Sequence, residues 1–116
     1  MFSETLKFVG ELLPDIKNTR WGNKTDFYTL YIALASLLRT RGIKPAKMRE
    51  LREAIDKFAA EIDRRLADEG ANVSKTAMDY VRAVEKGAND KKRRADRHVA
   101  LMSIIGSFFG EKKGSK

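Results

Sequence analysis

The sequence predicts an all-α fold, a compact bundle of about five helices. Apolar residues recur at three- and four-residue spacing in five separate segments, and this spacing places them on one face of a helix. Glycine or proline separates most of these segments, and no segment has a convincing strand pattern. At 116 residues the chain is long enough to bury one core. We therefore expect a single helical domain over residues 1–109 and a disordered basic tail over residues 110–116.

The N-terminal part predicts one short helix followed by a polar loop. Ser3 is a favourable N-cap for a helix over Ser3–Leu13, and Pro14 ends it because proline has no amide hydrogen for the helical ladder. The predicted inward positions of this helix are Leu6, Val9 and Leu13. The polar loop Asp15–Lys24 contains the only tryptophan, Trp21.

Two long helices are predicted in the centre of the chain. One covers Thr25–Arg41 and is followed by Gly42, at the position where glycine commonly ends a helix. The next begins at Pro45, which is tolerated in a first helical turn, and runs to about Glu69. Their apolar stripes are Phe27, Leu30, Tyr31, Leu34 and Leu38 in the first, and Met48, Leu51, Ile55, Phe58, Ile62 and Leu66 in the second. We expect these two helices to form the spine of the bundle.

Two further helices are predicted before the tail. Ser74 caps the first, which ends near Lys86 and is followed by Gly87, and either Asn89 or Asp90 caps the second. Their predicted inward residues are Ala77, Tyr80, Val81 and Val84 in the first, and Val99, Leu101, Met102, Ile105 and Phe108 in the second. The last helix changes abruptly from strongly basic to strongly apolar.

The net charge of +8 is concentrated in the C-terminal part of the chain. Residues 1–70 carry 13 basic and 11 acidic side chains, whereas residues 71–116 carry 11 and 5. This asymmetry favours an anionic partner, and ordinary solubility is the alternative explanation. Without cysteine, neither a disulfide framework nor a thiolate zinc site is possible. The N-terminus has no signal-peptide pattern, and Val99–Phe109 is about half the ~20 residues of a membrane span, so we expect a cytoplasmic protein without a membrane partner.

The first candidate site is the basic start of the last helix. Cations fixed on one helix can meet neighbouring phosphates, and arginine is suited to bidentate phosphate contacts. The four-residue spacing predicts that Arg93 and Arg97 share one face, as do Arg94 and His98. The candidate nucleic-acid-binding residues of this helix are Lys91, Lys92, Arg93, Arg94, Arg97 and His98. The main alternative is that these side chains form structural salt bridges with acidic residues of neighbouring helices.

The polar loop is the second candidate site. Arg20 and Lys24 flank Trp21, and a cation beside an aromatic ring can hold a phosphate and stack a base. The alternative is a helix-entry loop in which Trp21 fills the edge of the core.

Catalytic and metal sites are not indicated by the sequence. His98 is the only histidine, and no partner for acid–base chemistry can be nominated for it. No glycine-rich phosphate loop or metal-binding helix motif is present, so we expect no metal and no cofactor.

Two stretches of the chain resemble a known family. Arg20-Trp-Gly-Asn-Lys-Thr-Asp-Phe-Tyr-Thr-Leu-Tyr, and Asn89 through His98 with the apolar helix that follows, are similar to the helical C-terminal region of the ParB/sulfiredoxin-like family of uncharacterised domains. GmrSD-type restriction and phage-defence proteins belong to that family. Its nucleotide hydrolysis and DNA cleavage depend on an N-terminal domain marked by Asp-Gly-Gln-Gln-Arg, a motif that is absent here. The resemblance therefore implies a non-catalytic region whose late basic residues contact DNA or pack against a catalytic domain.

The charge pattern and the resemblance together predict a non-catalytic accessory module of a restriction-like defence protein that contributes to DNA binding. The alternative, of a different class, is an interaction or scaffold domain. Its basic helix would dock on an acidic partner, or on a ParB-like catalytic domain in the full-length protein or in a partner subunit. An independent enzyme is the weakest of the three hypotheses.

Overall fold

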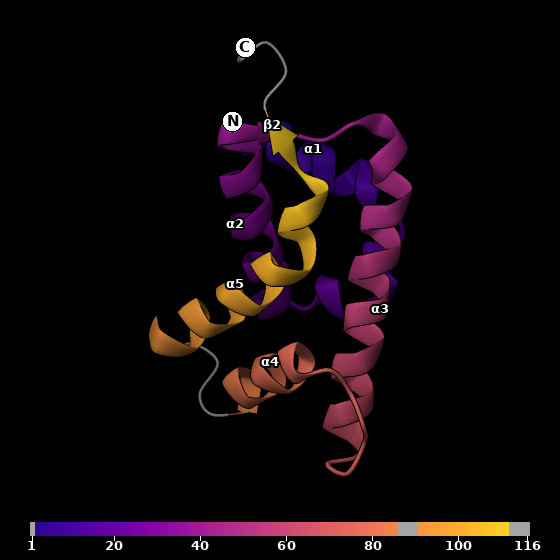
Figure 1. The fold of residues 1–116 in the computed structure, drawn as a ribbon, viewed down its shortest axis with the longest axis vertical. Helices are drawn as coiled ribbons and strands as arrows, with labels where there is room; N and C mark the ends of the chain where they lie inside the picture. Colours follow the sequence, from indigo (N-terminus) through magenta and orange to yellow (C-terminus); the bar gives the residue numbers. More distant parts are fainter. Residues whose placement is uncertain (1, 86–90, 112–116) are drawn as a thin grey trace.

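The computed structural model describes residues 2–85 and 91–111, and five α-helices build the core within these ranges (Figure 1). They are α1 (Phe2–Leu12), α2 (Lys24–Thr40), α3 (Met48–Ala67), α4 (Lys75–Glu85) and α5 (Lys91–Ile105). The predicted all-α bundle is confirmed. The expected caps of the last helix, Asn89 and Asp90, lie outside the described residues.

The helices are arranged around α5. Figure 1 shows α3, the longest helix, along one side of the molecule and α2 on the other, with α5 crossing between them. α5 packs against α2, α3 and α4, and α1 packs against α2 and α3. This arrangement brings the beginning of α5 close to the beginning of α2, although about 70 residues separate them in the sequence.

Side-chain caps determine where two of the helices begin. Asn23 Oδ1 accepts a hydrogen bond of 3.0 Å from the amide two residues later, and Ser74 Oγ accepts one of 3.1 Å from the amide three residues later. These bonds satisfy amides that have no partner inside the helix. Pro45 begins a short 3-10 turn, Pro45–Lys47, rather than α3 itself, which is a correction to the predicted start. Such turns are common at the ends of α-helices.

The predicted polar loop between α1 and α2 is folded into two short 3-10 turns, Ile16–Asn18 and Arg20–Gly22. Thr19 joins them, and its Oγ1 accepts a hydrogen bond of 3.2 Å from the Trp21 amide. Gly22 is required by a close approach, because a Cβ at this position would lie 2.9 Å from a backbone oxygen of the first turn. The two turns direct Trp21 into the core.

The apolar face predicted for α3 is confirmed, whereas the face predicted for α5 is partly wrong. The buried apolar residues of α3 include Leu51, Ile55, Phe58 and Ile62. In α5, Leu101 and Ile105 are buried as predicted, but Val99 is 67% exposed. The next residue, Ala100, is buried instead, and a small side chain at a helix contact allows two helices to approach closely.

The buried face of α2 is partly polar. Leu30 and Leu34 are buried as predicted, but Asp26 and Thr29 are buried on the same face, while Phe27 is half-exposed. The buried face is therefore rotated from the predicted stripe at the beginning of the helix. The candidate residues Arg20 and Arg97 bond to these two polar side chains, Arg20 to Asp26 and Arg97 to Thr29.

A two-residue antiparallel ladder ties the α2–α3 connection to the chain after α5. β1 (Arg41–Gly42) pairs with β2 (Gly110–Glu111). The sequence predicts neither a strand nor order after residue 109, so the ladder corrects the predicted boundary for residues 110 and 111. Residues 112–116 of the predicted tail lie outside the described residues. A ladder this short has little stability of its own, so it depends on the helices that it joins.

Candidate nucleic-acid interface

The basic cluster predicted at the start of α5 is divided between the surface and the core. Lys91, Lys92 and Arg94 are exposed, Arg93 and His98 are half-buried, and Arg97 is only 1% exposed. The Asp96 carboxylate lies 3.3 Å from Lys92 Nζ and 3.9 Å from Arg93 Nη1. These ion pairs offset the repulsion between cations and the positive end of the helix dipole. The cluster therefore does not form one continuous phosphate-binding face.

Arg97 belongs to the core face of α5, which corrects its prediction as a surface contact for phosphate. It lies four residues before Leu101 and eight before Ile105, so the three side chains share one face of the helix. Arg97 Nε donates a hydrogen bond of 3.1 Å to Thr29 Oγ1 of α2. The enclosed guanidinium thus holds α5 against α2.

Arg20 and Trp21 are also structural, and this favours the alternative interpretation of the loop. Arg20 Nη1 lies 2.6 Å from Asp26 Oδ2, and Arg20 Nε lies 2.9 Å from Asp63 Oδ1. Trp21 is completely buried and meets the Tyr80 ring edge-on, with 6.2 Å between ring centroids and an interplanar angle of 78°. Of the three loop candidates, Lys24 alone remains exposed.

Tyr80 of α4 completes a buried polar network. Its hydroxyl donates a hydrogen bond of 2.5 Å to Asp26 Oδ1, while Asp26 Oδ2 accepts from Arg20. Burial, followed by the negative charge of Asp26 and this hydrogen bond, raises the pKa of Tyr80 above its ordinary value, and the charges of Arg97 and Arg20 oppose the rise only in part. The buried Asp26 carboxylate therefore accepts from both the Tyr80 hydroxyl and the Arg20 guanidinium, so its charge is compensated inside the core.

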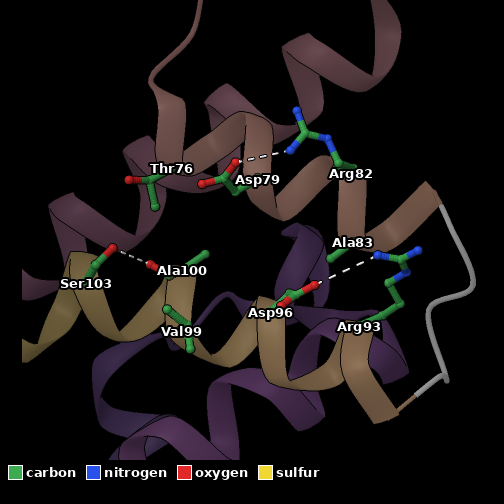
Figure 2. Close-up of a pocket in the computed structure, with 9 residues that line it drawn as sticks. All are labelled: Thr76, Asp79, Arg82, Ala83, Arg93, Asp96, Val99, Ala100 and Ser103. Atoms are coloured by element: carbon green, nitrogen blue, oxygen red, sulfur yellow. Dashed lines mark hydrogen bonds and ion pairs between the residues drawn. The ribbon is translucent and has the colours of Figure 1, made fainter.

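A groove of about 340 Å³ lies between α4 and α5, and Figure 2 shows the side chains that line it. Its charged residues form pairs of opposite sign: Arg82 Nη1 lies 3.6 Å from Asp79 Oδ1, and Arg93 Nη1 lies 3.9 Å from Asp96 Oδ2. A polyanion that enters this groove meets two carboxylates as well as two guanidiniums. The field in the groove therefore does not favour phosphate.

A second groove lies between the first turns of α2 and α5, and we call it the Lys24–Arg94 groove. Its lining residues are Lys24, Thr25, Phe27, Tyr28 and Arg94, together with the edge of Arg97. Its volume is about 570 Å³. None of these lining side chains is acidic, because Asp26, the acidic residue in the first turn of α2, is buried. The two candidate segments of the sequence meet in this groove.

Tyr28 and Phe27 line the groove, although the sequence pattern did not single them out as functional. Tyr28 is 56% exposed, whereas Phe27 is half-buried and packs against Tyr31 with 6.2 Å between ring centroids. Tyr28 follows Lys24 by four residues on α2, so helical spacing places the aromatic ring and the ammonium group on one face. This spacing is the signal that identifies the pair from sequence.

The structure gives no metal site within its described ranges. Among residues 2–85 and 91–111, no group of three or more His, Cys, Asp or Glu side chains could hold a metal ion. His98 Nδ1 is buried and has no hydrogen-bond partner in this part of the chain. No helix in these ranges is long and apolar enough to cross a membrane.

No protein-family model, curated protein or solved structure matches this chain. The resemblance to the ParB/sulfiredoxin-like family therefore stays a prediction.

Proposed function

We propose that this chain is a non-catalytic nucleic-acid-binding module, and that its contact surface is the Lys24–Arg94 groove together with the neighbouring Lys91. The observation that carries the proposal is the composition of the groove. Two exposed cationic side chains and an exposed aromatic ring line one hollow, without an acidic side chain among the described lining residues. Nucleic-acid phosphates are bound by Lys and Arg, and bases stack on aromatic side chains.

The setting that we propose is an accessory role in a restriction or phage-defence protein. It rests on the resemblance of Arg20–Tyr31 and Asn89–His98 to a family in which DNA chemistry belongs to another domain. The excess of 6 positive charges over residues 71–116 supports an anionic partner, because such a field steers association. In this role the module holds DNA while a ParB-like catalytic domain, in the same protein or in a partner subunit, performs the reaction.

A protein partner is the second candidate function. Tyr28 and Ile32 lie one helical turn apart on α2 and are both exposed. Tyrosine and arginine are enriched where proteins bind one another, so this strip beside Arg94 also suits an acidic protein surface.

A charge-removal experiment separates the two candidates. The test variant combines Lys24→Gln with Arg94→Gln, and the matched control combines Arg49→Gln with Lys75→Gln. The control residues lie on α3 and α4, and both their side chains are 85% exposed. Both variants lose the same net charge, so only the position of the charge differs. Binding to a fluorescent DNA single strand and to its duplex is measured by anisotropy between about 50 and 200 mM salt.

The expected result is binding that weakens with salt. If Lys24, Arg94 and Lys91 each neutralise one phosphate, log K falls with log salt at a slope of about −2 on a single strand and about −3 on a duplex. The test variant makes this slope shallower by about 1.4 to 1.8, whereas the control variant leaves it unchanged. Equal losses in the two variants would refute the groove as the contact surface. Absence of binding to both DNA forms at about 50 mM salt, by a protein with a normal melting curve, would favour a protein partner.

A further inference from the structure

The Lys24–Arg94 groove contains an aromatic ring that phosphate binding alone does not need. Tyr28 is 56% exposed, although the next two residues of α2, Thr29 and Leu30, are buried. The neighbouring Phe27 ring, which also lines the groove, packs against Tyr31 of the same helix. An aromatic ring that faces a groove between two cations can receive the flat face of a base.

The shape of the groove favours a single strand over a duplex. Lys24 and Arg94 line a hollow of about 570 Å³, which lies within the range of roughly 300–1,000 Å³ for pockets that enclose small ligands. A duplex is read by an element that protrudes into its major groove, and the faces of its bases are covered by their neighbours. The bases of a single strand can be splayed out onto an aromatic side chain. A hollow with an aromatic wall therefore fits a splayed nucleotide.

We propose that the Lys24–Arg94 groove binds single-stranded nucleic acid, with one base stacked on the Tyr28 ring and the neighbouring phosphates held by Lys24 and Arg94. This inference rests on the proposed function and narrows it to one form of nucleic acid. Every base has a flat face, and the two cations contact only the backbone. Binding is therefore expected to show little sequence preference.

The test compares three ligands and three variants by fluorescence anisotropy at low salt. The ligands are a labelled single strand of about 12 nucleotides, its duplex, and a strand of the same length in which the central nucleotides are abasic. Tyr28→Ala removes the ring, and Tyr28→Phe keeps the ring without its hydroxyl. Ile32→Ala is the matched control, because Ile32 is an exposed apolar residue one turn further along the same helix. A melting curve for each variant establishes that it is folded.

The expected result is that the chain binds the single strand more tightly than the duplex. Tyr28→Ala weakens binding to the single strand by roughly 5- to 150-fold, the range expected for loss of one aromatic stack. Tyr28→Phe and Ile32→Ala retain most of the affinity, and the abasic strand binds the unaltered protein and Tyr28→Ala equally. The inference is overturned if the duplex binds as tightly as the single strand, or if Tyr28→Ala weakens the abasic strand as much as the complete one. Failure of the proposed function has a different outcome, the loss of binding to all three ligands.

Discussion

Tyr80→Phe should change how the stability of the fold depends on alkaline pH. In an unfolded chain a tyrosine loses its proton near pH 10, whereas in the folded protein burial and the Asp26 carboxylate raise the pKa of Tyr80 above this value. Above about pH 10 the unfolded state therefore binds fewer protons than the folded state, and the free energy of unfolding falls as the pH rises. The stability contributed by neutral Tyr80 is complete below that pH and is lost above it.

The size of this effect follows from proton linkage. One such group lowers the free energy of unfolding by about 1.4 kcal/mol between about pH 9 and pH 11. For a chain of this size that corresponds to a fall in melting temperature of about 5 °C beyond the decline caused by other groups. Tyr80→Phe is less stable at neutral pH by roughly 1–3 kcal/mol, because the buried Asp26 carboxylate loses a donor, but it lacks the additional alkaline decline.

The assay is a series of thermal melts of both proteins from about pH 8 to pH 11, followed by circular dichroism. All other titratable groups are the same in both proteins, so the difference between the two curves isolates Tyr80. Near-ultraviolet absorbance provides a second readout, because Tyr80 should ionise only when the protein unfolds. Parallel declines in the two proteins, or ionisation of Tyr80 while the protein is still folded, would refute the reasoning.

Three further predictions concern the core, the division of the basic cluster and the absence of catalysis. Phe58→Ala and Leu34→Ala should each lower the free energy of unfolding by roughly 2–5 kcal/mol, because both side chains are buried; urea unfolding with unchanged midpoints would contradict this. Arg97→Met should destabilise the fold by about 1–3 kcal/mol, whereas Arg94→Met should stay within about 0.5 kcal/mol in the same measurement. Equal effects of the two substitutions would refute the division of the basic cluster between core and surface. The purified chain with Mg²⁺ should neither cleave plasmid DNA nor hydrolyse nucleotides; cleavage that is abolished by His98→Ala would show a catalytic site.

The helices could be predicted from local chemistry, but their rotation could not. Ser74 marks a helix start because a side-chain cap depends only on the residues beside it. Whether Val99 or Ala100 faces inward depends on how α5 packs against its neighbouring helices. Periodicity alone cannot distinguish two neighbouring apolar positions when the partner helix is unknown.

The candidate site could be predicted only in its exposed part. Lys24 and Arg94 are exposed cations, as expected for residues in a polar loop and at the basic start of a helix. The same pattern placed Arg97 on the surface, because burying an arginine requires polar partners from distant segments, here Thr29 on α2. The four-residue spacing between Arg97 and Leu101 indicates that they share one face of the helix. It does not show whether a polar partner is available to bind a buried guanidinium.

The buried network also has a consequence for how genetic screens of this protein should be interpreted. Lys24 lies two residues before Asp26, and Arg94 lies three residues before Arg97, so each wall of the groove is anchored to the core within one helical turn. A random library selected for loss of binding should therefore recover Asp26 and Arg97 as often as the exposed contacts. The inactive variants would then separate into two groups, those with a normal melting curve and those whose melting temperature falls.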